Sequence, residues 1–525
     1  MTLTGGTLNL NGQTIGNNVT LGAGSIAGSG SIAGTISGTS AFTKAGTGSL
    51  ILSGNNTYSG GTNVTLGTLT LGSGTALGTG AVTLTGGTLN LNGQTVGNNI
   101  TLAGGVLNGA GTLGGTVSGA SALTRSGVGT LTLNGNNTYA GGTTLSAGTL
   151  IAGSDTALGS GAVTISGGTL NLGSRTIANT ITLSSGSLDG TALNGSKLVL
   201  QGGEVTGAVT SGALSKTGNG TVTLSGNNTY AGGTTVSAGT LALNSANALG
   251  SGTVTLAGGS LDVKSQTVAK DITLTANSSV AGTDGTIAGV ISGDRLLTKV
   301  GAGTLTLSGI NTFTGGAVIN AGTLEVTGSI LGNVVVSAGG MLAGSGVVGD
   351  IAVVDGGTVG AGAVGAVGSL SADSLSLQGG AKVELNFSDA SLDGGAGFDR
   401  FLLSGQLDFS AVSAGNKLTL LLLGLPTTFD PEGAYSFGFI TYGSLNLGAN
   451  GNISDLFTID ASGLKDQFGG SLDASKFSLV DDAANNQVRL NYLAAIPEPS
   501  TYGLSLGCLG LAVAAVRRRR RLASA

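Results

Sequence analysis

The chain has 525 residues, of which 102 are Gly, 9% are charged, and none is His or Trp. Basic residues number 20 against 25 acidic ones, and five of the basic residues stand together near the C-terminus. This balance argues against nucleic-acid binding, which needs a basic face, and the absence of His together with a single cysteine, Cys508, excludes the common zinc sites.

The first residues already belong to a repeated pattern. The string Thr-Leu-Thr-Gly-Gly-Thr-Leu-Asn-Leu-Asn-Gly-Gln-Thr follows Met1 and recurs after Val82. Because a β-helix normally protects its first coil with a cap, we expect that Met1 is an internal start and that a cap and a signal peptide lie upstream. A leaderless protein that begins at Met1 is the alternative.

One block then returns along the chain. It reads Lys-Ala-Gly-Thr-Gly-Ser-Leu-Ile-Leu-Ser-Gly-Asn-Asn-Thr-Tyr-Ser-Gly-Gly-Thr from Lys44 to Thr62, and further copies begin at Arg125, Lys216 and Lys299. Within a copy Thr and Leu alternate, as in residues 130–133, so the leucines share one face of a strand and the threonines share the other. One such strand cannot bury its apolar face alone, whereas stacked equivalents form a continuous core.

The pattern therefore predicts an all-β chain in which residues 1–370 form a right-handed parallel β-helix, a solenoid with several short strands per coil. Glycines supply the corners that need positive φ. At roughly 20 residues per coil, this solenoid would have about 15–20 coils. The Asn pairs, such as Asn136-Asn137, have two interpretations: amide ladders along the solenoid, or tolerance of the turn conformation.

Residues 371–495 are richer in Phe, Asp and Lys, and we expect them to form a β-rich C-terminal cap. Within them, residues 394–399 match one unit of a calcium-binding nonapeptide pattern. A single unit lacks the stacked neighbour that completes each calcium site, so a plain turn is the preferred interpretation. No metal site and no cofactor is predicted.

Residues 496–525 form a tail with three parts. The motif Pro497, Glu498, Pro499 comes first, an apolar run from Tyr502 to Val516 follows, and the basic cluster is Arg517, Arg518, Arg519, Arg520 and Arg521. The run is shorter than the roughly 20 residues of a standard span, and it predicts a short transmembrane helix whose arginines stay on the cytoplasmic side. The prolines keep the motif extended, in a form that a protease can grip. A permanent tail anchor is the alternative.

Both features resemble known families. The stretch from Gly218 to Thr234, followed by Ala238-Gly239-Thr240-Leu241, resembles the autotransporter-associated β-strand repeat, and the resemblance covers roughly residues 1–345. It implies a passenger-like β-helical rod. The tail closely resembles the PEP-CTERM sorting signal, which implies recognition by the membrane protease exosortase, removal of the tail, and an association with exopolysaccharide and biofilm matrix.

No catalytic arrangement is predicted, because a nucleophile–base pair cannot be assembled without His. No motif brings two acids of the solenoid together; among these acids are Asp155, Asp189, Glu204, Asp262 and Asp271.

We therefore expect an exported structural or adhesive protein and not an enzyme. It would be tethered to the inner membrane until exosortase processes it, and would then act at the cell surface or outside. Exopolysaccharide or other surface glycans are the expected partners, and nucleic acid is not. Two alternatives stay open: a polysaccharide-active β-helix enzyme, by analogy of fold alone, and an autotransporter-type passenger adhesin.

Overall fold

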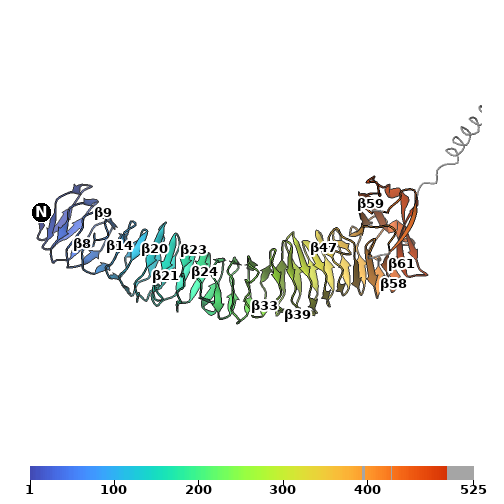
Figure 1. Cartoon of the computed structure of the whole chain (residues 1–525), viewed down its shortest axis with the longest axis horizontal. Coiled ribbons are helices and arrows are strands. Elements are labelled where there is room, and N and C mark those ends of the chain that lie inside the picture. Colours follow the sequence, from blue (N-terminus) through green and yellow to red (C-terminus); the bar gives the residue numbers. More distant parts are fainter. Residues whose placement is uncertain (393–395, 427, 494–525) are drawn as a thin grey trace, which may run out of the picture. The chain divides into compact units, whose positions relative to one another are not determined.

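The computed structural model describes residues 1–392, 396–426 and 428–493. They fall into two compact units, one made of residues 1–318 and 328–332, the other of residues 319–327 and those from 333 onward. Strands dominate both units (Figure 1). The helices of the described residues are three short 3-10 turns, Gly195–Lys197, Ile453–Leu456 and Ala474–Lys476.

Strands of the first unit pair in parallel with strands one coil away. Strand β10 (Thr62–Val64) pairs with β8 (Phe42–Lys44) on one side and with β12 (Val82–Leu84) on the other, in a register where partners lie 20 residues apart. The next pairings, of β12 with β15 (Ile100–Leu102) and of β15 with β18 (Val117–Gly119), use shifts of 18 and 17 residues. The predicted all-β parallel solenoid is thereby confirmed.

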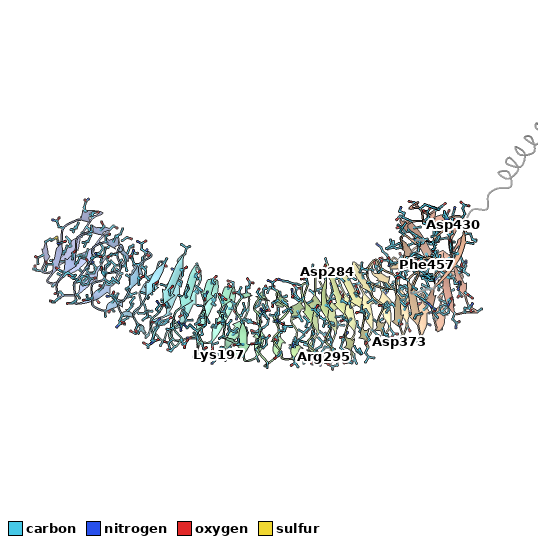
Figure 2. The ribbon with its side chains drawn as sticks, viewed as in Figure 1. Lys197, Asp284, Arg295, Asp373, Asp430 and Phe457 are labelled. Atoms are coloured by element: carbon cyan, nitrogen blue, oxygen red, sulfur yellow. The ribbon has the colours of Figure 1, made fainter. Side chains whose placement is uncertain are left out.

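The alternation of Thr and Leu places the core as predicted. In β20 (Thr130–Leu133), Leu131 and Leu133 are fully buried while Thr130 is exposed. Neighbouring coils stack like on like, so that the buried leucines Leu50, Leu69, Leu89 and Leu107 follow one another in consecutive coils. Each fully buried Leu contributes about 1.5–3 kcal/mol relative to exposure. Charged side chains such as Lys197, Asp284 and Arg295 lie exposed on the surface of this unit (Figure 2).

A buried tyrosine–threonine pair recurs at one corner of three repeats. The hydroxyls of Tyr58, Tyr139 and Tyr230 lie 2.5–2.6 Å from the Oγ1 atoms of the threonines four residues later, Thr62, Thr143 and Thr234. Burial raises the pKa of all three phenols, that of Tyr230 to about 12. The fourth repeat has Phe313 and Ala317 instead, so the hydroxyl and its partner are absent together.

The residue that begins each repeated block is a buried cation, which sequence analysis did not foresee. Lys44 Nζ donates to the main-chain oxygens of Ala45, Gly46 and Leu66 at 2.7–3.1 Å. Lys216 and Lys299 likewise donate to carbonyl oxygens. Because burial disfavours the charged form, the pKa values of these three lysines lie below the usual range.

Arg125 takes the same position in the second repeat. Its Nη2 donates to the carbonyls of Val128 and Gly129 at 2.8 and 2.9 Å, and its Nη1 donates to Asn108 Oδ1 at 3.1 Å. The carbonyl oxygens at these corners are therefore satisfied by a cation in place of water.

The Asn pairs do something that neither interpretation described. Asn137 Oδ1 accepts a bond from Val117 N at 2.7 Å, and its Nδ2 donates to Ala157 O at 2.6 Å, so one side chain links three coils. Asn136 accepts from Thr156 Oγ1. Because these partners are main-chain groups and a hydroxyl, Asn136 and Asn137 form no ladder of side-chain amides, and neither residue has a positive φ.

The second unit also contains parallel ladders, and two of them lead to its last strands. The first is β50 (Thr358–Gly360), β53 (Lys382–Phe387), β56 (Leu418–Gly424) and β59 (Phe457–Leu464). The second is β51 (Ser369–Ala372), β54 (Arg400–Leu403) and β57 (Ala434–Thr441).

The second ladder ends in a change of direction. Strand β57 pairs antiparallel with β61 (Gln487–Leu493), which pairs antiparallel with β60 (Phe477–Asp482). An aromatic cluster of Phe429, Tyr435, Phe437, Phe477 and Tyr492 packs around these strands. The antiparallel strands thus pair an edge of β57 that would otherwise be free to join another chain.

We predict that the tyrosine–threonine pair is energetically coupled. Tyr139→Phe and Thr143→Ala should each destabilise the surrounding coil by about 1 kcal/mol, and the double variant should cost less than the sum, because neither partner is then left alone. Hydrogen exchange of the coil amides measures the local free energy of opening.

The fourth repeat supplies the matched control. Phe313→Tyr should destabilise its coil because the new hydroxyl faces Ala317, and adding Ala317→Thr should restore the stability. Additive effects in both repeats would contradict the coupling.

We also predict that Arg125→Lys is tolerated within about 1 kcal/mol, because Lys occupies the corresponding position in the other repeats. Arg125→Met should cost about 2 kcal/mol or more, because the carbonyls of Val128 and Gly129 lose their donor. Urea denaturation compares the variants, and equal stability of the Lys and Met variants would refute the role of the charge.

Candidate functional site

The sorting residues predicted from the sequence lie outside the described residues. This applies to Pro497, Glu498 and Pro499, to the apolar run from Tyr502 to Val516, and to the cluster Arg517, Arg518, Arg519, Arg520 and Arg521. Within the described ranges no helix has the length and apolar character needed to cross a membrane. The short transmembrane helix and the roles of these residues stay predictions.

The five solenoid acids named from the sequence are dispersed, and each of these five accepts a hydrogen bond within the fold. Asp155 and Asp271 accept from main-chain N–H groups of the following coil, those of Thr176 and Val290. Asp189 accepts from Asn171, Glu204 from Ser225, and Asp262 from the N–H of Lys264. In the part of the chain that the structure describes, no group of three or more His, Cys, Asp or Glu residues could hold a metal ion.

Asp399, the last residue of the calcium-type unit, has a structural role. Its side chain is fully buried, and its two oxygens accept bonds from Gly368 N at 2.9 Å, Asn386 N at 2.8 Å and Asn386 Nδ2 at 2.9 Å. Burial is the main cause that raises the pKa of Asp399 to about 7, and the charge of Glu384 adds to it. The carboxyl group therefore ties β53 to the segment before β51.

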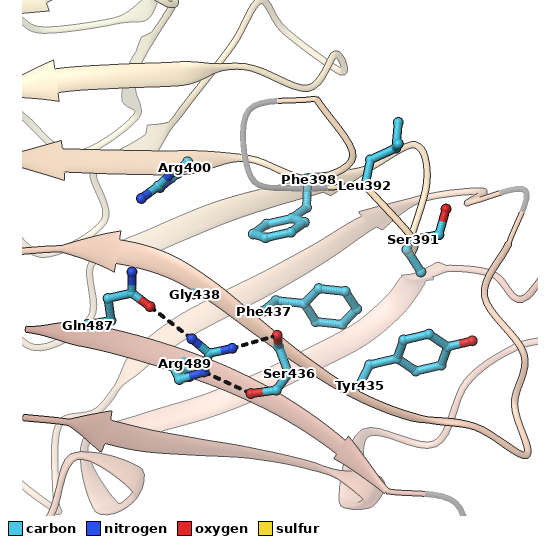
Figure 3. Close-up of a pocket in the computed structure, with 11 residues that line it drawn as sticks. Ser391, Leu392, Phe398, Arg400, Tyr435, Ser436, Phe437, Gly438, Gln487 and Arg489 are labelled. Carbon is cyan, nitrogen blue, oxygen red and sulfur yellow. Dashed lines mark hydrogen bonds between the residues drawn. The ribbon is translucent and has the colours of Figure 1, made fainter. Parts of the chain in front are cut away.

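The second unit carries a pocket of about 460 Å³ on the face formed by β54, β57 and β61 (Figure 3). Its lining residues are Ala390, Ser391, Leu392, Phe398, Arg400, Tyr435, Ser436, Phe437, Gly438, Gln487 and Arg489. Two of the five arginines that precede the tail line it, and none of the lining residues within the described ranges is acidic. Two guanidinium groups thus lie at one pocket of a chain that has an overall acidic excess.

Strand alternation and a bulge build this pocket. In β61 the side chains of Val488 and Leu490 are buried, while Gln487 and Arg489 lie on the opposite face. The register of β57 against β61 shifts between Gly438 and Ile440. Gly438 gives these side chains room, because a Cβ there would lie 2.5 Å from Gln487 Oε1 and 3.3 Å from Arg489 Nη1.

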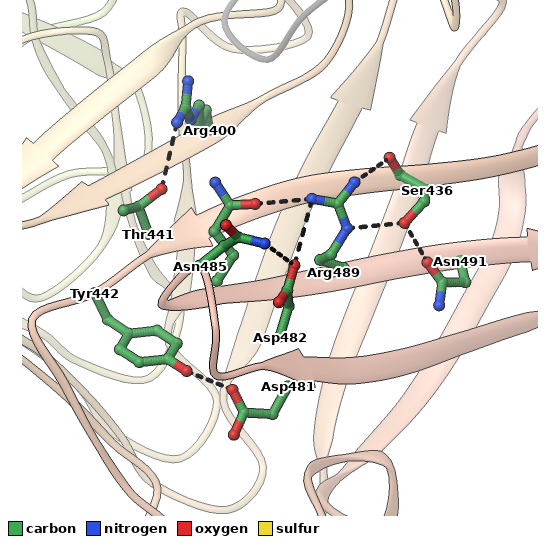
Figure 4. A network of polar contacts seen from close by, with 10 residues as sticks. Arg400, Ser436, Thr441, Tyr442, Asp481, Asp482, Asn485, Arg489 and Asn491 are labelled. Atoms are coloured by element: carbon green, nitrogen blue, oxygen red, sulfur yellow. Dashed lines mark hydrogen bonds and ion pairs between the residues drawn. The ribbon is translucent and has the colours of Figure 1, made fainter.

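Arg489 is held by a polar network (Figure 4). Its Nε donates to Ser436 Oγ and its Nη2 to Ser436 O, both at 2.9 Å, and its Nη1 donates to Gln487 Oε1 at 2.8 Å. Asp482 Oδ2 lies 3.9 Å from Nη1 and offsets part of the charge. Three hydrogen bonds fix the plane of this guanidinium without using all five of its N–H groups.

Arg400 forms fewer hydrogen bonds than Arg489 among the described residues. Its Nη2 donates to Thr441 Oγ1 at 3.4 Å, and its buried Nε has no hydrogen-bond partner among the described residues. Within the described ranges it forms no ion pair. Most of its donors are therefore free to meet an acceptor that enters the pocket (Figure 3).

We predict that Asp399 makes the stability of the chain depend on pH. Its ordinary pKa is 3.8 and its folded value is about 7, so between these pH values the folded chain holds a proton that the unfolded chain has released. Stability attributable to Asp399 must then fall as pH rises through this window. Melting temperatures of the native chain and Asp399→Asn at pH 5 and pH 8 test this, and an equal pH slope in both would contradict it.

Comparison with known proteins explains the repeats and the tail. Residues 42–71, 123–152, 214–243 and 297–326 match the family described as passenger-associated-transport-repeat. Each match contains one of the buried cations and one of the Tyr or Phe positions. Residues 495–521 match the PEP-CTERM protein-sorting motif.

A relative among characterised proteins is named an autotransporter adhesin. The chain is 39% identical over 125 residues to "Adhesin BmaC autotransporter" of Brucella suis biovar 1 (strain 1330). The similar region is 20% of this chain and only 4% of the adhesin, so the match compares a part of each protein and not whole proteins. This chain is an exported protein of the cell envelope, with four passenger-associated-transport repeats in a β-solenoid fold and a C-terminal PEP-CTERM sorting motif.

Proposed function

We propose that this protein is a structural or adhesive element of the cell surface or biofilm matrix, released from an inner-membrane tether by exosortase. The observation that carries the proposal is the combination of a repeat-built parallel solenoid with a PEP-CTERM motif. A solenoid places equivalent groups at a constant spacing over a long surface, and the sorting motif directs that surface to the envelope.

The outward face of the solenoid supports an adhesive role. The middle residues of β8, β10, β12, β15 and β18 are all polar and stand beside one another in consecutive coils; they are Thr43, Asn63, Thr83, Thr101 and Ser118. Neighbouring strands lie about 4.8 Å apart, so these side chains form a ladder of hydroxyl and amide groups. Weak hydrogen bonds to exopolysaccharide or another surface glycan would multiply along such a ladder.

The adhesive role is also supported by the relative from Brucella suis, which is named an autotransporter adhesin. An autotransporter-type passenger is thus the second candidate, and it shares the surface role while differing in the export route. The enzyme alternative gains no comparable support, because the acids of the solenoid are separately bonded within the fold.

Tagged full-length protein, followed in cells with and without an exosortase, tests the proposal. We expect the tail to be removed and the protein to reach the surface or medium only where the protease is present. Without it, the intact chain should collect in the inner-membrane fraction, because Arg517 to Arg521 hold the tail on the cytoplasmic side.

A motif variant and a neighbouring control refine this experiment. The triple variant Pro497→Ala, Glu498→Ala and Pro499→Ala should remain unprocessed in exosortase-positive cells, whereas Ser500→Ala should be processed normally. A chain that keeps its tail and stays in the cytoplasm in both strains would refute the sorting proposal.

A further inference from the structure

The pocket on β54, β57 and β61 has the features of a site for an anion. Arg400 and Arg489 both line it, and none of the lining residues that the structure describes is acidic, although Asp482 lies 3.9 Å from Arg489 Nη1. Planar guanidinium groups match the two oxygens of a carboxylate with parallel hydrogen bonds. Because Arg489 is already fixed by Ser436 and Gln487, little of its freedom would be lost when a ligand binds.

Arg400 supplies the sharpest indication of a missing partner. A buried donor without an acceptor destabilises the fold, and more so when the group is charged. The Nε of Arg400 is such a donor, whereas the Nε of Arg489 bonds Ser436. This Nε is itself buried, so an anion in the pocket would meet the Nη groups of Arg400, one of which donates to Thr441.

Three aromatic side chains also line this pocket. The rings of Tyr435 and Phe437 are nearly parallel, with centroids 5.8 Å apart and an interplanar angle of 7°, and Phe398 packs edge-on against Phe437 at 5.1 Å. Phe398 and Phe437 are buried, while Tyr435 remains partly exposed. A pyranose ring has an apolar face of C–H groups that suits such aromatic side chains.

The remaining lining groups and the size of the pocket fit a sugar. The hydroxyls of Ser391 and Ser436 and the amide of Gln487 are neutral hydrogen-bonding groups of the kind that orient a polar ligand. The volume of about 460 Å³ lies within the roughly 300–1,000 Å³ of small-molecule sites.

We infer that this pocket binds an acidic sugar, a uronic-acid unit of a surface glycan, with its carboxylate on Arg400 and Arg489 and its ring against Tyr435. The inference rests on the proposed function, because a place in the envelope or matrix is what brings the chain into contact with such glycans. It adds a localised site of higher selectivity to the weak contacts of the solenoid ladder.

Calorimetric titration of the full-length chain with trigalacturonate tests the inference, with the neutral galactose trisaccharide and sodium sulfate as comparison ligands. Trigalacturonate should bind, more weakly as salt increases, and each comparison ligand should bind at least tenfold more weakly. Arg400→Gln and Arg489→Gln should each reduce its affinity at least tenfold, and Gly438→Val should block binding by filling the pocket.

Lys417→Gln is the matched control, because it removes one positive charge from the same unit at an exposed position away from the pocket lining. Its affinity for trigalacturonate should equal that of the native chain. Melting curves accompany every variant, and Arg400→Gln is the decisive one because Arg400 makes few bonds within the fold.

Three results would overturn the inference. One is unchanged trigalacturonate affinity in a folded Arg400→Gln chain, another is equal binding of the neutral trisaccharide, and the third is binding of sulfate as tight as that of the sugar. The sorting experiment is independent of these results. A chain that is processed and displayed but does not bind trigalacturonate would refute the pocket and leave the proposed function standing.

Discussion

Main-chain hydrogen bonding between neighbouring coils is the constraint on which each unit depends. An inner strand such as β10 has its N–H and C=O groups taken up by strands about 20 residues earlier and later. This register brings like residues into columns, so the core of leucines and the outer ladder of polar groups are two consequences of one pairing. An outer surface with a regular repeat follows from the same hydrogen bonds that fold the chain.

The pairing of strands stops at the corners of each coil. There, side chains form the hydrogen bonds that the main-chain groups would otherwise lack. Buried cations such as Lys44 and bridging asparagines such as Asn137 form hydrogen bonds with the carbonyl and N–H groups that strand pairing does not use. The repeat motif is therefore conserved within the chain at positions that satisfy buried polar groups. Its threonines and leucines alone would describe many β-rich sequences, whereas these corner residues define this solenoid.

The strands and the core could be predicted from the sequence, because alternation assigns side chains to faces and near-identical repeats require stacking. The burial of Lys44 and Arg125 could not, since Lys and Arg are ordinarily exposed and only the fold reveals the carbonyls around them. The pocket was equally hidden. Arg400 and Arg489 are far apart in sequence. They line the same pocket only because β57 pairs with β54 on one side and with β61 on the other.

The buried lysines have a consequence for the conditions in which the protein can work. Lys44 bonds carbonyl dipoles of the main chain and not a carboxylate. Dissolved ions weaken exposed ion pairs most, and they reach a buried contact with a neutral dipole far less. A solenoid fastened in this way keeps its coils together in dilute and in saline surroundings alike, which suits a molecule placed outside the regulated interior of the cell.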